Sequence, residues 1–493
     1  MRRFMTQTVR NLRREDSGFA LVWLAIILVL LLGMAGFATD LGWIYLNTVR
    51  TQNAVDAAAL AGVVNLPGFD PAPDAEAAAR ANGYDPGGAD TLTLTPNADN
   101  QLHAELSTSV SPFFMKVFGF THFDITREAT AEYVKPVPLG SPSNCFGGGN
   151  LVPGCGGAED FWAAVSGRMS RVEDGDPYST QCNINAPGPS CSSNNPNYAR
   201  AGAYQGYYYG VDVQPGTTDL QVYVWDAGFQ PRNPVGSQTG DLILANGGNT
   251  YVNTSFTLYP PDTTPLIPWD HLSGGPVCTM TQNPGTPGSI WNWNQLCSTQ
   301  ANPTPGIWLV HVETTNNSSG SNNFAIRAEG SPDPRVYGIN DMSIWSNNLS
   351  GASELYLAEI GEEHAGKKLE LAFYDAGDAN AESWYYVKDP FGNIPTCSWT
   401  VWDYRWPLPS ASQVDSGSGA CQWQTQVPGG SGSGVYNKQW IVATIDLPDD
   451  SADMCNESAT YPCYWKMLLD LAQPTERTTW QARVIGNPVH LLP

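Results

Sequence analysis

The sequence predicts a mainly β fold with an N-terminal transmembrane helix, a small α+β juxtamembrane domain and two repeated antiparallel β-sandwich domains. Three observations lead to this prediction. Residues 19–38 form an apolar run without a single charge. Glycine and proline are frequent, with 49 and 38 residues among 493, which favours turns and short strands over long helices. The C-terminal part of the chain repeats one series of alternating strands.

The apolar run is long enough to cross a bilayer. At about 1.5 Å per residue, a helix of this length spans about 30 Å, the thickness of the hydrocarbon core. Five arginines precede it and the first charge after it is Asp40, so the positive-inside rule places the N-terminus in the cytoplasm and the rest outside. A cleaved secretory signal is the alternative, but such signals have a shorter apolar run and a small-x-small cleavage site. We expect a cytoplasmic basic segment over residues 1–18 and a single-pass anchor over residues 19–39.

The charge of the chain restricts its partners. The formal net charge is -23, and it becomes -28 without the first fourteen residues, which hold five Arg and no acid. Such a surface repels nucleic acid and anionic headgroups, so we expect neither to bind the exported part.

The segment after the span predicts a small α+β domain over residues 40–135. Its Ala-rich run, residues 46–64, favours a helix that continues the anchor, and the Asn-Leu-Pro-Gly sequence at 65–68 ends it. A shorter helix with Asp74 and Glu76 in its first turn follows, and it ends at Asn82-Gly83. Alternating residues then predict strands at 92–94, 102–110 and 123–134.

This region carries a family resemblance. The sequence QNAVDAAALAG at residues 52–62 follows the apolar span and the Asp40-Leu-Gly42 exit. Together these features resemble the N-terminal region of TadG-like proteins of the bacterial tight-adherence (Flp) pilus-assembly system. The resemblance covers residues 10–135 and implies that residues 112–119 form a short apolar helix before the closing strand. It also implies other pilus-assembly or envelope proteins as partners.

The chain departs from its relatives at two places. Processed pilin-like relatives have Glu at the fifth position after the cleaved Gly, whereas cleavage after Gly18 would put Trp23 there. Many TadG-like proteins carry a von Willebrand A domain with an Asp-x-Ser-x-Ser metal site. The nearest strings here both fail: the one that starts at Asp341 lacks the second Ser, and the one that starts at Asp415 has Gly at both Ser positions. We therefore expect no such domain.

A Pro-, Gly- and Ser-rich linker over residues 136–157 separates this domain from an internal repeat. Strands at 208–213, 220–226, 308–313 and 324–330 match strands at 356–360, 369–375, 465–470 and 480–486 in the same order. We predict two copies of one antiparallel sandwich, residues 158–331 and 332–493. The pattern resembles jelly-roll modules of secreted bacterial proteins in architecture only.

The ten cysteines all lie beyond residue 140, as expected of a domain that is oxidised after export. Short loops close at little entropic cost, so disulfides between neighbouring cysteines are favoured. The alternative is that some disulfides join distant loops or that some thiols stay free. The favoured pairs are Cys145 with Cys155, Cys182 with Cys191, Cys278 with Cys297, Cys397 with Cys421, and Cys455 with Cys463.

Few residues suggest chemistry. The six histidines form no zinc motif, and the chain has no GxSxG or P-loop. Asp226 and Asp375 occupy equivalent Asp-Ala-Gly segments of the two repeats. A structural turn is favoured over a calcium site at both, because each segment offers only one carboxylate. We therefore predict no catalytic, metal or cofactor site.

The tryptophans divide into two groups. Trp308, Trp465 and Trp480 lie at repeated strand positions and are expected in the core. Four others lie in loop-like segments and are the candidates for contact with a ligand such as a glycan: Trp291, Trp293, Trp402 and Trp406.

We therefore predict a non-enzymatic, single-pass component of the Flp pilus-assembly or cell-envelope system, with two sandwiches outside the cytoplasm. The alternative is an anchored surface adhesin that binds glycan through loop aromatics. An exported hydrolase ranks third because no convergent set of acid, base and nucleophile is evident.

Overall fold

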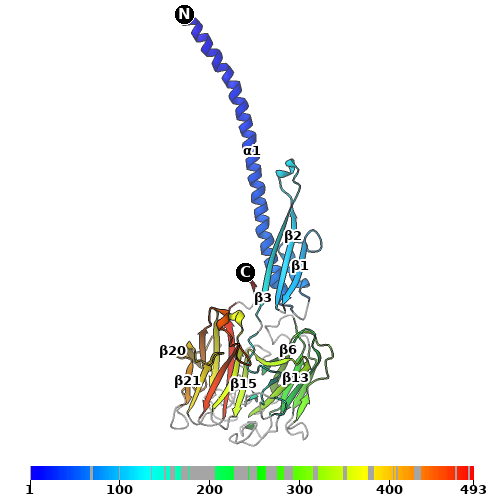
Figure 1. The fold of residues 1–493 in the computed structure, drawn as a ribbon, viewed down its shortest axis with the longest axis vertical. Coiled ribbons are helices and arrows are strands. Elements are labelled where there is room, and N and C mark those ends of the chain that lie inside the picture. The colour runs from blue at the N-terminus through cyan, green and yellow to red at the C-terminus, as the bar shows by residue number, and fades with distance from the viewer. Residues whose placement is uncertain are drawn as a thin grey trace. The chain divides into compact units, whose positions relative to one another are not determined.

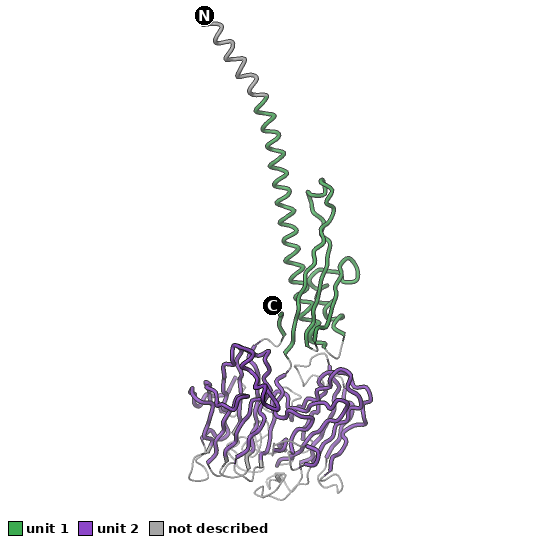
Figure 2. Tube along the Cα trace, viewed as in Figure 1, with its two compact units in different colours: residues 1–134, 489–493 green, residues 135–488 purple. Residues whose placement is uncertain are grey.

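In the computed structural model the chain forms two compact units. One consists of residues 1–134 and 489–493, and the other of residues 135–488 (Figure 2). The residues that the structure describes are 2–66, 70–98, 100–134, 136–148, 152–155, 161–167, 177, 206–226, 242–243, 252–262, 275–282, 292–314, 320–347, 352–375, 382–403, 405–406, 409–426, 435–471, 475–486 and 489–492.

The first unit combines one long helix, one short helix and a four-stranded antiparallel sheet (Figure 1). Its sheet order is β1-β2-β3-β25. The elements are α1 (Arg2–Val63), α2 (Ala72–Ala81), β1 (Thr91–Ala98), β2 (Gln101–Val110), the 3₁₀ helix η1 (Met115–Phe118), β3 (Phe123–Tyr133) and β25 (Val489–Leu492).

Local sequence signals explain where these elements begin and end. The helix α1 ends at Val63, just before the predicted Asn-Leu-Pro-Gly stop. The helix α2 has Asp74 in its first turn, and the chain leaves it through Asn82 and Gly83, which takes φ +90°. The short helix η1 ends at Gly119 in the left-handed region. These helices and strands agree with the predicted fold class.

The second unit is entirely β apart from two 3₁₀ helices, among the described residues. Its strands are β4 (Cys145–Phe146), β5 (Phe161–Ser166), β6 (Tyr207–Val213), β7 (Thr218–Asp226), β8 (Leu242–Ile243), β9 (Thr254–Tyr259), β10 (Cys278–Gln282), β11 (Trp293–Gln295), β12 (Gly306–Thr314), β13 (Gly320–Ser331), β14 (Arg335–Ile339), β15 (Asp341–Asn347), β16 (Ala352–Glu359), β17 (Lys368–Asp375), β18 (Ser383–Lys388), β19 (Thr396–Asp403), β20 (Gln413–Ala420), β21 (Gln422–Gln426), β22 (Gln439–Asp446), β23 (Tyr464–Leu471) and β24 (Thr475–Ile485). The 3₁₀ helices are η5 (Glu362–His364) and η6 (Ser451–Asp453).

These strands form three sheets. A five-stranded sheet has the order β10-β9-β12-β6-β14, and a four-stranded sheet has the order β16-β23-β18-β21. The third sheet has twelve strands, ten of them in the order β11-β7-β13-β5-β15-β24-β17-β22-β19-β20, while β4 and β8 also pair with β13. The named strand pairs around these sheets are antiparallel, as the fold class predicted.

The four matched strand segments pair in the same way in both halves of the second unit. In the first half β6 pairs with β12 and β7 pairs with β13. In the second half β16 pairs with β23 and β17 pairs with β24. Each half therefore places its first and third matched strands in one sheet and its second and fourth in the other, as a repeated sandwich requires.

One sheet continues across both halves, a feature that the sequence analysis did not anticipate. The strand β5 pairs with β13 on one side and with β15 on the other, and β15 pairs in turn with β24. The strand β14 lies beyond residue 331 yet pairs with β6 of the first half. The halves therefore share a layer, and a division of the chain at residue 331 stays a prediction.

The core also joins the halves. Buried side chains of both form one apolar cluster, with Tyr209 and Phe324 from the first half and Phe373 and Trp465 from the second. Leu139 adds backbone bridges to Gly338 of β14 and Ala358 of β16. This continuity predicts that both halves unfold together.

A partly buried polar contact reinforces the same junction. The guanidinium of Arg335, on β14, is paired with Glu359 of β16 and donates to the hydroxyl of Tyr464 on β23. The Tyr464 hydroxyl also donates to the carbonyl of Ser141, 3.0 Å away. Charge and hydrogen bonds therefore hold one half against the other.

Candidate functional site

The apolar stretch of α1 forms the first part of the candidate site. Its large apolar side chains between residues 19 and 37 are exposed. Among the described residues, α1 is the one helix long and apolar enough to cross a membrane. An exposed apolar surface of this length is typical of a helix surrounded by lipid.

Asp40 lies just after this stretch and is fully buried. Its carboxylate accepts hydrogen bonds from the backbone N–H groups of Phe113, Phe114 and Met115, at 2.7, 2.8 and 2.6 Å. Three N–H groups at the start of η1 thus share one acceptor group, which satisfies donors that a helix start leaves unpaired. We call this set of contacts the Asp40 clamp.

Two further contacts fix the same loop to α1. A Cβ atom at Gly36 would lie 3.0 Å from Cγ of Phe114, so the absence of a side chain at Gly36 lets this ring approach the helix. The rings of Trp43 and Phe113 lie 5.3 Å apart. The connection between β2 and β3 is therefore held against α1 where the apolar stretch ends.

Beyond the clamp, α1 packs on the sheet and on α2 through its smallest residues. Ala54, Ala58 and Ala59 are fully buried together with Val55 and Val63. The small side chains of the DAAALAG sequence allow the helix backbone to come close to its neighbours, which explains why the block is rich in Ala and Gly.

The polar residues of the block also have structural partners. The amide of Gln52 donates to Asp56, at 2.8 Å, and to the carbonyl of Glu128 on β3, at 3.0 Å. The hydroxyl of Thr51 lies 3.0 Å from that of Tyr84. These hydrogen bonds fix the rotation of α1 on the sheet.

Gly62 is the tightest point of this packing. A Cβ atom there would lie 2.7 Å from a methyl of Leu102 and 3.1 Å from Cβ of Ala75. We expect Gly62→Val to destabilise the first unit by about 1–3 kcal/mol, because overpacking forces neighbours out of place. The matched variant is Gly42→Val, since a Cβ atom at Gly42 meets nothing within 4 Å. Hydrogen exchange of the β2 amides measures the stability of the first unit in both variants. Equal loss of protection in the two variants would contradict the packing account.

In the second unit, Asp226 is buried at the end of β7, with 7% of its surface exposed. One carboxyl oxygen accepts a hydrogen bond from the side-chain amide of Asn322, at 3.2 Å, and the other has no hydrogen-bond partner among the described residues. The same amide donates to Thr254, at 2.8 Å. Burial raises the pKa of Asp226 to about 7, and the Asn322 hydrogen bond opposes this rise.

The second predicted turn aspartate, Asp375, ends β17, and its side chain lies outside the described residues. The Ala-Gly pairs that follow both aspartates also lie outside them. Within the described part of the chain, no three His, Cys, Asp or Glu side chains gather where a metal ion would bind. The expectation that neither turn binds calcium stays a prediction.

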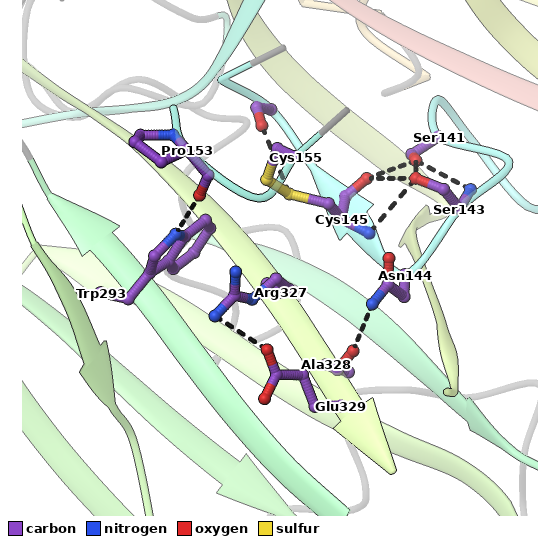
Figure 3. Close-up of a disulfide and its surroundings, with 11 residues drawn as sticks. Ser141, Ser143, Asn144, Cys145, Pro153, Cys155, Trp293, Arg327, Ala328 and Glu329 are labelled. Carbon is purple, nitrogen blue, oxygen red and sulfur yellow. Dashed lines mark hydrogen bonds and ion pairs between the residues drawn. A yellow bond between two sulfur atoms is a disulfide. The ribbon is translucent and has the colours of Figure 1, made fainter. Parts of the chain in front are cut away.

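Trp293 was expected in a loop, but it lies in β11 and is partly buried (Figure 3). Its indole N–H donates to the carbonyl of Pro153, at 2.7 Å. The guanidinium of Arg327 lies over its ring, 4.5 Å from the centroid, and also pairs with Glu329 at 2.9 Å. The indole donor and one ring face are therefore used within the protein, and a ligand contact of Trp293 stays a prediction.

Of the other candidate tryptophans, one lies in a strand and one keeps the expected loop position. Trp402 lies in β19, and Trp406 follows that strand. Both pack partly buried against the apolar cluster, with the ring of Trp406 5.1 Å from that of Trp440. Trp291 lies outside the described residues. Trp308, Trp465 and Trp480 are buried in the core, as predicted.

Four of the favoured cysteine pairs form disulfides in the structure. Their Cα atoms lie 5.5, 5.8, 5.5 and 4.3 Å apart in Cys145–Cys155, Cys278–Cys297, Cys397–Cys421 and Cys455–Cys463. The remaining pair, Cys182 with Cys191, lies outside the described residues. The first disulfide closes the loop that carries Pro153, the acceptor for Trp293 (Figure 3).

The role of Asp40 was not found from the sequence, where it only marked the end of the apolar span. The signal available was an aspartate at the membrane exit together with an apolar loop starting at Pro112. The two are more than seventy residues apart, so no local pattern joins them.

Comparison with solved structures adds no support for a fold relative. The chain is similar to the N-terminal CBM22-1–CBM22-2 tandem domain of Xyn10C from Paenibacillus barcinonensis, at 8% identity, covering 81% of this chain and 92% of that one, with a TM-score of 0.12. It is also similar to tripeptidyl peptidase 2, at 8% identity, covering 87% of this chain and 40% of that one, with a TM-score of 0.14. Both TM-scores lie far below 0.5, so neither likeness carries an argument.

No curated protein matches the chain. The N-terminal part, however, matches a family model. A family model described as putative Flp pilus-assembly TadE/G-like matches residues 18–65, which hold the apolar stretch, Asp40 and the QNAVDAAALAG sequence at residues 52–62. Residues 18–65 therefore match a TadE/G-like segment of Flp pilus-assembly proteins, and in this chain that segment precedes a large β unit.

Proposed function

We propose that this protein is a non-enzymatic, single-pass membrane component of Flp pilus assembly that holds its β unit outside the cytoplasm. The match of residues 18–65 to the TadE/G-like family model is the observation that carries the proposal. It coincides with the one described helix able to cross a membrane.

Charge and disulfides support the orientation. Five arginines precede the apolar stretch, which favours a cytoplasmic N-terminus. The described part of the second unit contains four disulfides, and such bonds persist in oxidising compartments and are rare in the cytosol. Both observations favour a periplasmic or extracellular β unit.

The polar groups described in the second unit favour a structural role. Asp226, whose pKa is strongly raised, donates to or accepts from no described nucleophile or base, and its described contact is the amide of Asn322. A displayed β unit without catalysis fits a scaffold whose partners are other pilus-assembly or envelope proteins. We propose those partners in preference to glycan, because the described candidate tryptophans are partly buried by their own neighbours.

Deletion of the gene tests the proposal. We expect the deletion strain to lose Flp pili in electron micrographs and the intact gene to restore them. A Gln52→Ala, Asp56→Ala variant breaks contacts inside the family segment, whereas Asp453→Asn changes an exposed aspartate of the β unit. The first variant should restore fewer pili than the second. Normal pili in the deletion strain, together with glycan binding by the purified chain, would favour the adhesin alternative.

A further inference from the structure

The connection between β2 and β3 carries a group of exposed apolar side chains. These belong to Phe113, Phe114, Val117, Phe118 and Phe120, and Val117 and Phe118 are 84% and 75% exposed. We call residues 112–120 the apolar tip. Large side chains gathered on one loop and left exposed indicate a binding surface.

The apolar tip lies beside α1 at the end of its apolar stretch (Figure 1). The Asp40 clamp and the contact of Phe114 with Gly36 hold it there. Asp40 is two residues beyond Ala38, which is about 3 Å along a helix. The level of the tip along α1 is thus the level at which the span leaves the hydrocarbon core.

Backbone N–H groups of the apolar tip are paired within the protein, as a medium of low polarity requires. The N–H groups of residues 113–115 bind the Asp40 carboxylate. Those of Val117, Gly119 and Phe120 bind carbonyls of the tip itself, at 3.1, 3.1 and 3.2 Å. Backbone groups that enter lipid must be paired in this way, because lipid offers no partner.

We propose that the apolar tip inserts into the outer leaflet of the same bilayer that α1 crosses. The inference rests on the single-pass anchor of the proposed function. Exposed apolar side chains on α1, including Met34 and Phe37, continue toward the tip and give the lipid one contiguous apolar surface. The one charge of the tip, Lys116, is exposed on a flexible stem and reaches the headgroup phosphates, as lysines at membrane interfaces do.

The insertion gives the first unit a second membrane contact. A single helix leaves the attached domain free to rotate about the helix axis, whereas a helix and an inserted loop fix which face of the sheet is turned toward the membrane. The Asp40 clamp sets the depth of the loop, which explains why a carboxylate is buried at this position.

Spin labels on the full chain in phosphatidylcholine vesicles test the insertion. Labels are placed on Val117→Cys in the tip, Leu28→Cys within the span and Thr126→Cys on β3, an exposed position away from the tip. Collisions with oxygen report lipid, and collisions with a water-soluble nickel chelate report water. We expect the labels at Val117→Cys and Leu28→Cys to collide more often with oxygen than with the nickel chelate. The label at Thr126→Cys should collide severalfold more often with the nickel chelate.

Each outcome separates the tip from the anchor. If the label at 28 favours oxygen and the label at 117 favours nickel, the insertion is wrong and the anchor stands. If both labels favour nickel, the anchor is wrong and the insertion with it. Asp40→Asn places an amide donor against backbone N–H groups, so it should shift the label at 117 toward nickel without changing the label at 28. An unchanged label at 117 in that variant would overturn the role of the clamp.

Discussion

Replacing Asp226 by asparagine is expected to raise the free energy of unfolding by about 4 kcal/mol at pH 8 and to leave it within about 1 kcal/mol of the original at pH 4. The side chains have nearly the same shape, so the difference arises from ionisation. Burial raises the pKa of Asp226 to about 7 in the folded protein from its ordinary value of 3.8. Asparagine carries no charge at either pH.

The direction of the effect follows from proton binding. Between about pH 4 and 7 the folded state keeps a proton on Asp226 that the unfolded state has released, so folding is favoured by acid in this window. Stability then falls as the pH rises, by about 1.4 kcal/mol for each unit, over roughly three units. Above pH 7 the folded protein carries a buried charge whose one described partner is Asn322.

Denaturant unfolding of the full chain in detergent between pH 4 and 8 measures this difference. Asp453→Asn, at an exposed aspartate of η6, is the matched control and should follow the original protein at every pH. A constant difference between Asp226→Asn and the original protein would contradict the account. A melting temperature that millimolar calcium raises in the original protein, but not in an Asp226→Asn, Asp375→Asn variant, would show a metal site instead.

Replacing Trp480 by alanine is expected to destabilise the second unit by about 3–5 kcal/mol, as for other buried large aromatic residues. Trp480 is fully buried on β24, opposite Phe373 of β17 and Met342 of β15. Its indole N–H donates to the carbonyl of Leu357, at 3.2 Å, and the variant leaves that buried acceptor without this donor.

The shared sheet adds a second expectation for this variant. Because β24 pairs with both β15 and β17 within the continuous layer, the loss should lower one common unfolding transition of residues 135–488. Trp384→Ala, at a partly exposed position on β18, removes the same atoms and should cost less. Near-ultraviolet circular dichroism and hydrogen exchange follow the transition. Two transitions, with only one of them shifted by Trp480→Ala, would show that the halves fold independently.

Local sequence signals were sufficient for much of the first unit. The uncharged run predicted the exposed stretch of α1, and the Asn-Leu-Pro-Gly sequence predicted where α1 ends. Asn82 and Gly83 predicted the end of α2. These features depend on neighbouring residues, so the sequence contains them directly. Within the second unit, matching strand segments predicted a repeated sandwich, and the two halves pair these strands alike.

Features that depend on distant residues were not predicted. The pairing of β5 with β15 joins segments almost two hundred residues apart, and alternation along a strand does not reveal its partner. The strand β25 pairs with β3 of the first unit, although its sequence continues directly from the last repeat. Trp293 was expected in a loop because its segment, residues 289–295, is loop-like, whereas its partners Arg327 and Pro153 come from elsewhere in the chain.

The central claim, an anchored chain with an exported β unit, is tested most directly by the membrane topology. Two fusions serve this purpose, alkaline phosphatase joined after Tyr133 and the same enzyme joined before Phe19. The account predicts activity only in the first, because phosphatase folds after export and the arginines hold the N-terminus in the cytoplasm. An inactive fusion after Tyr133, with an active one before Phe19, would contradict the account.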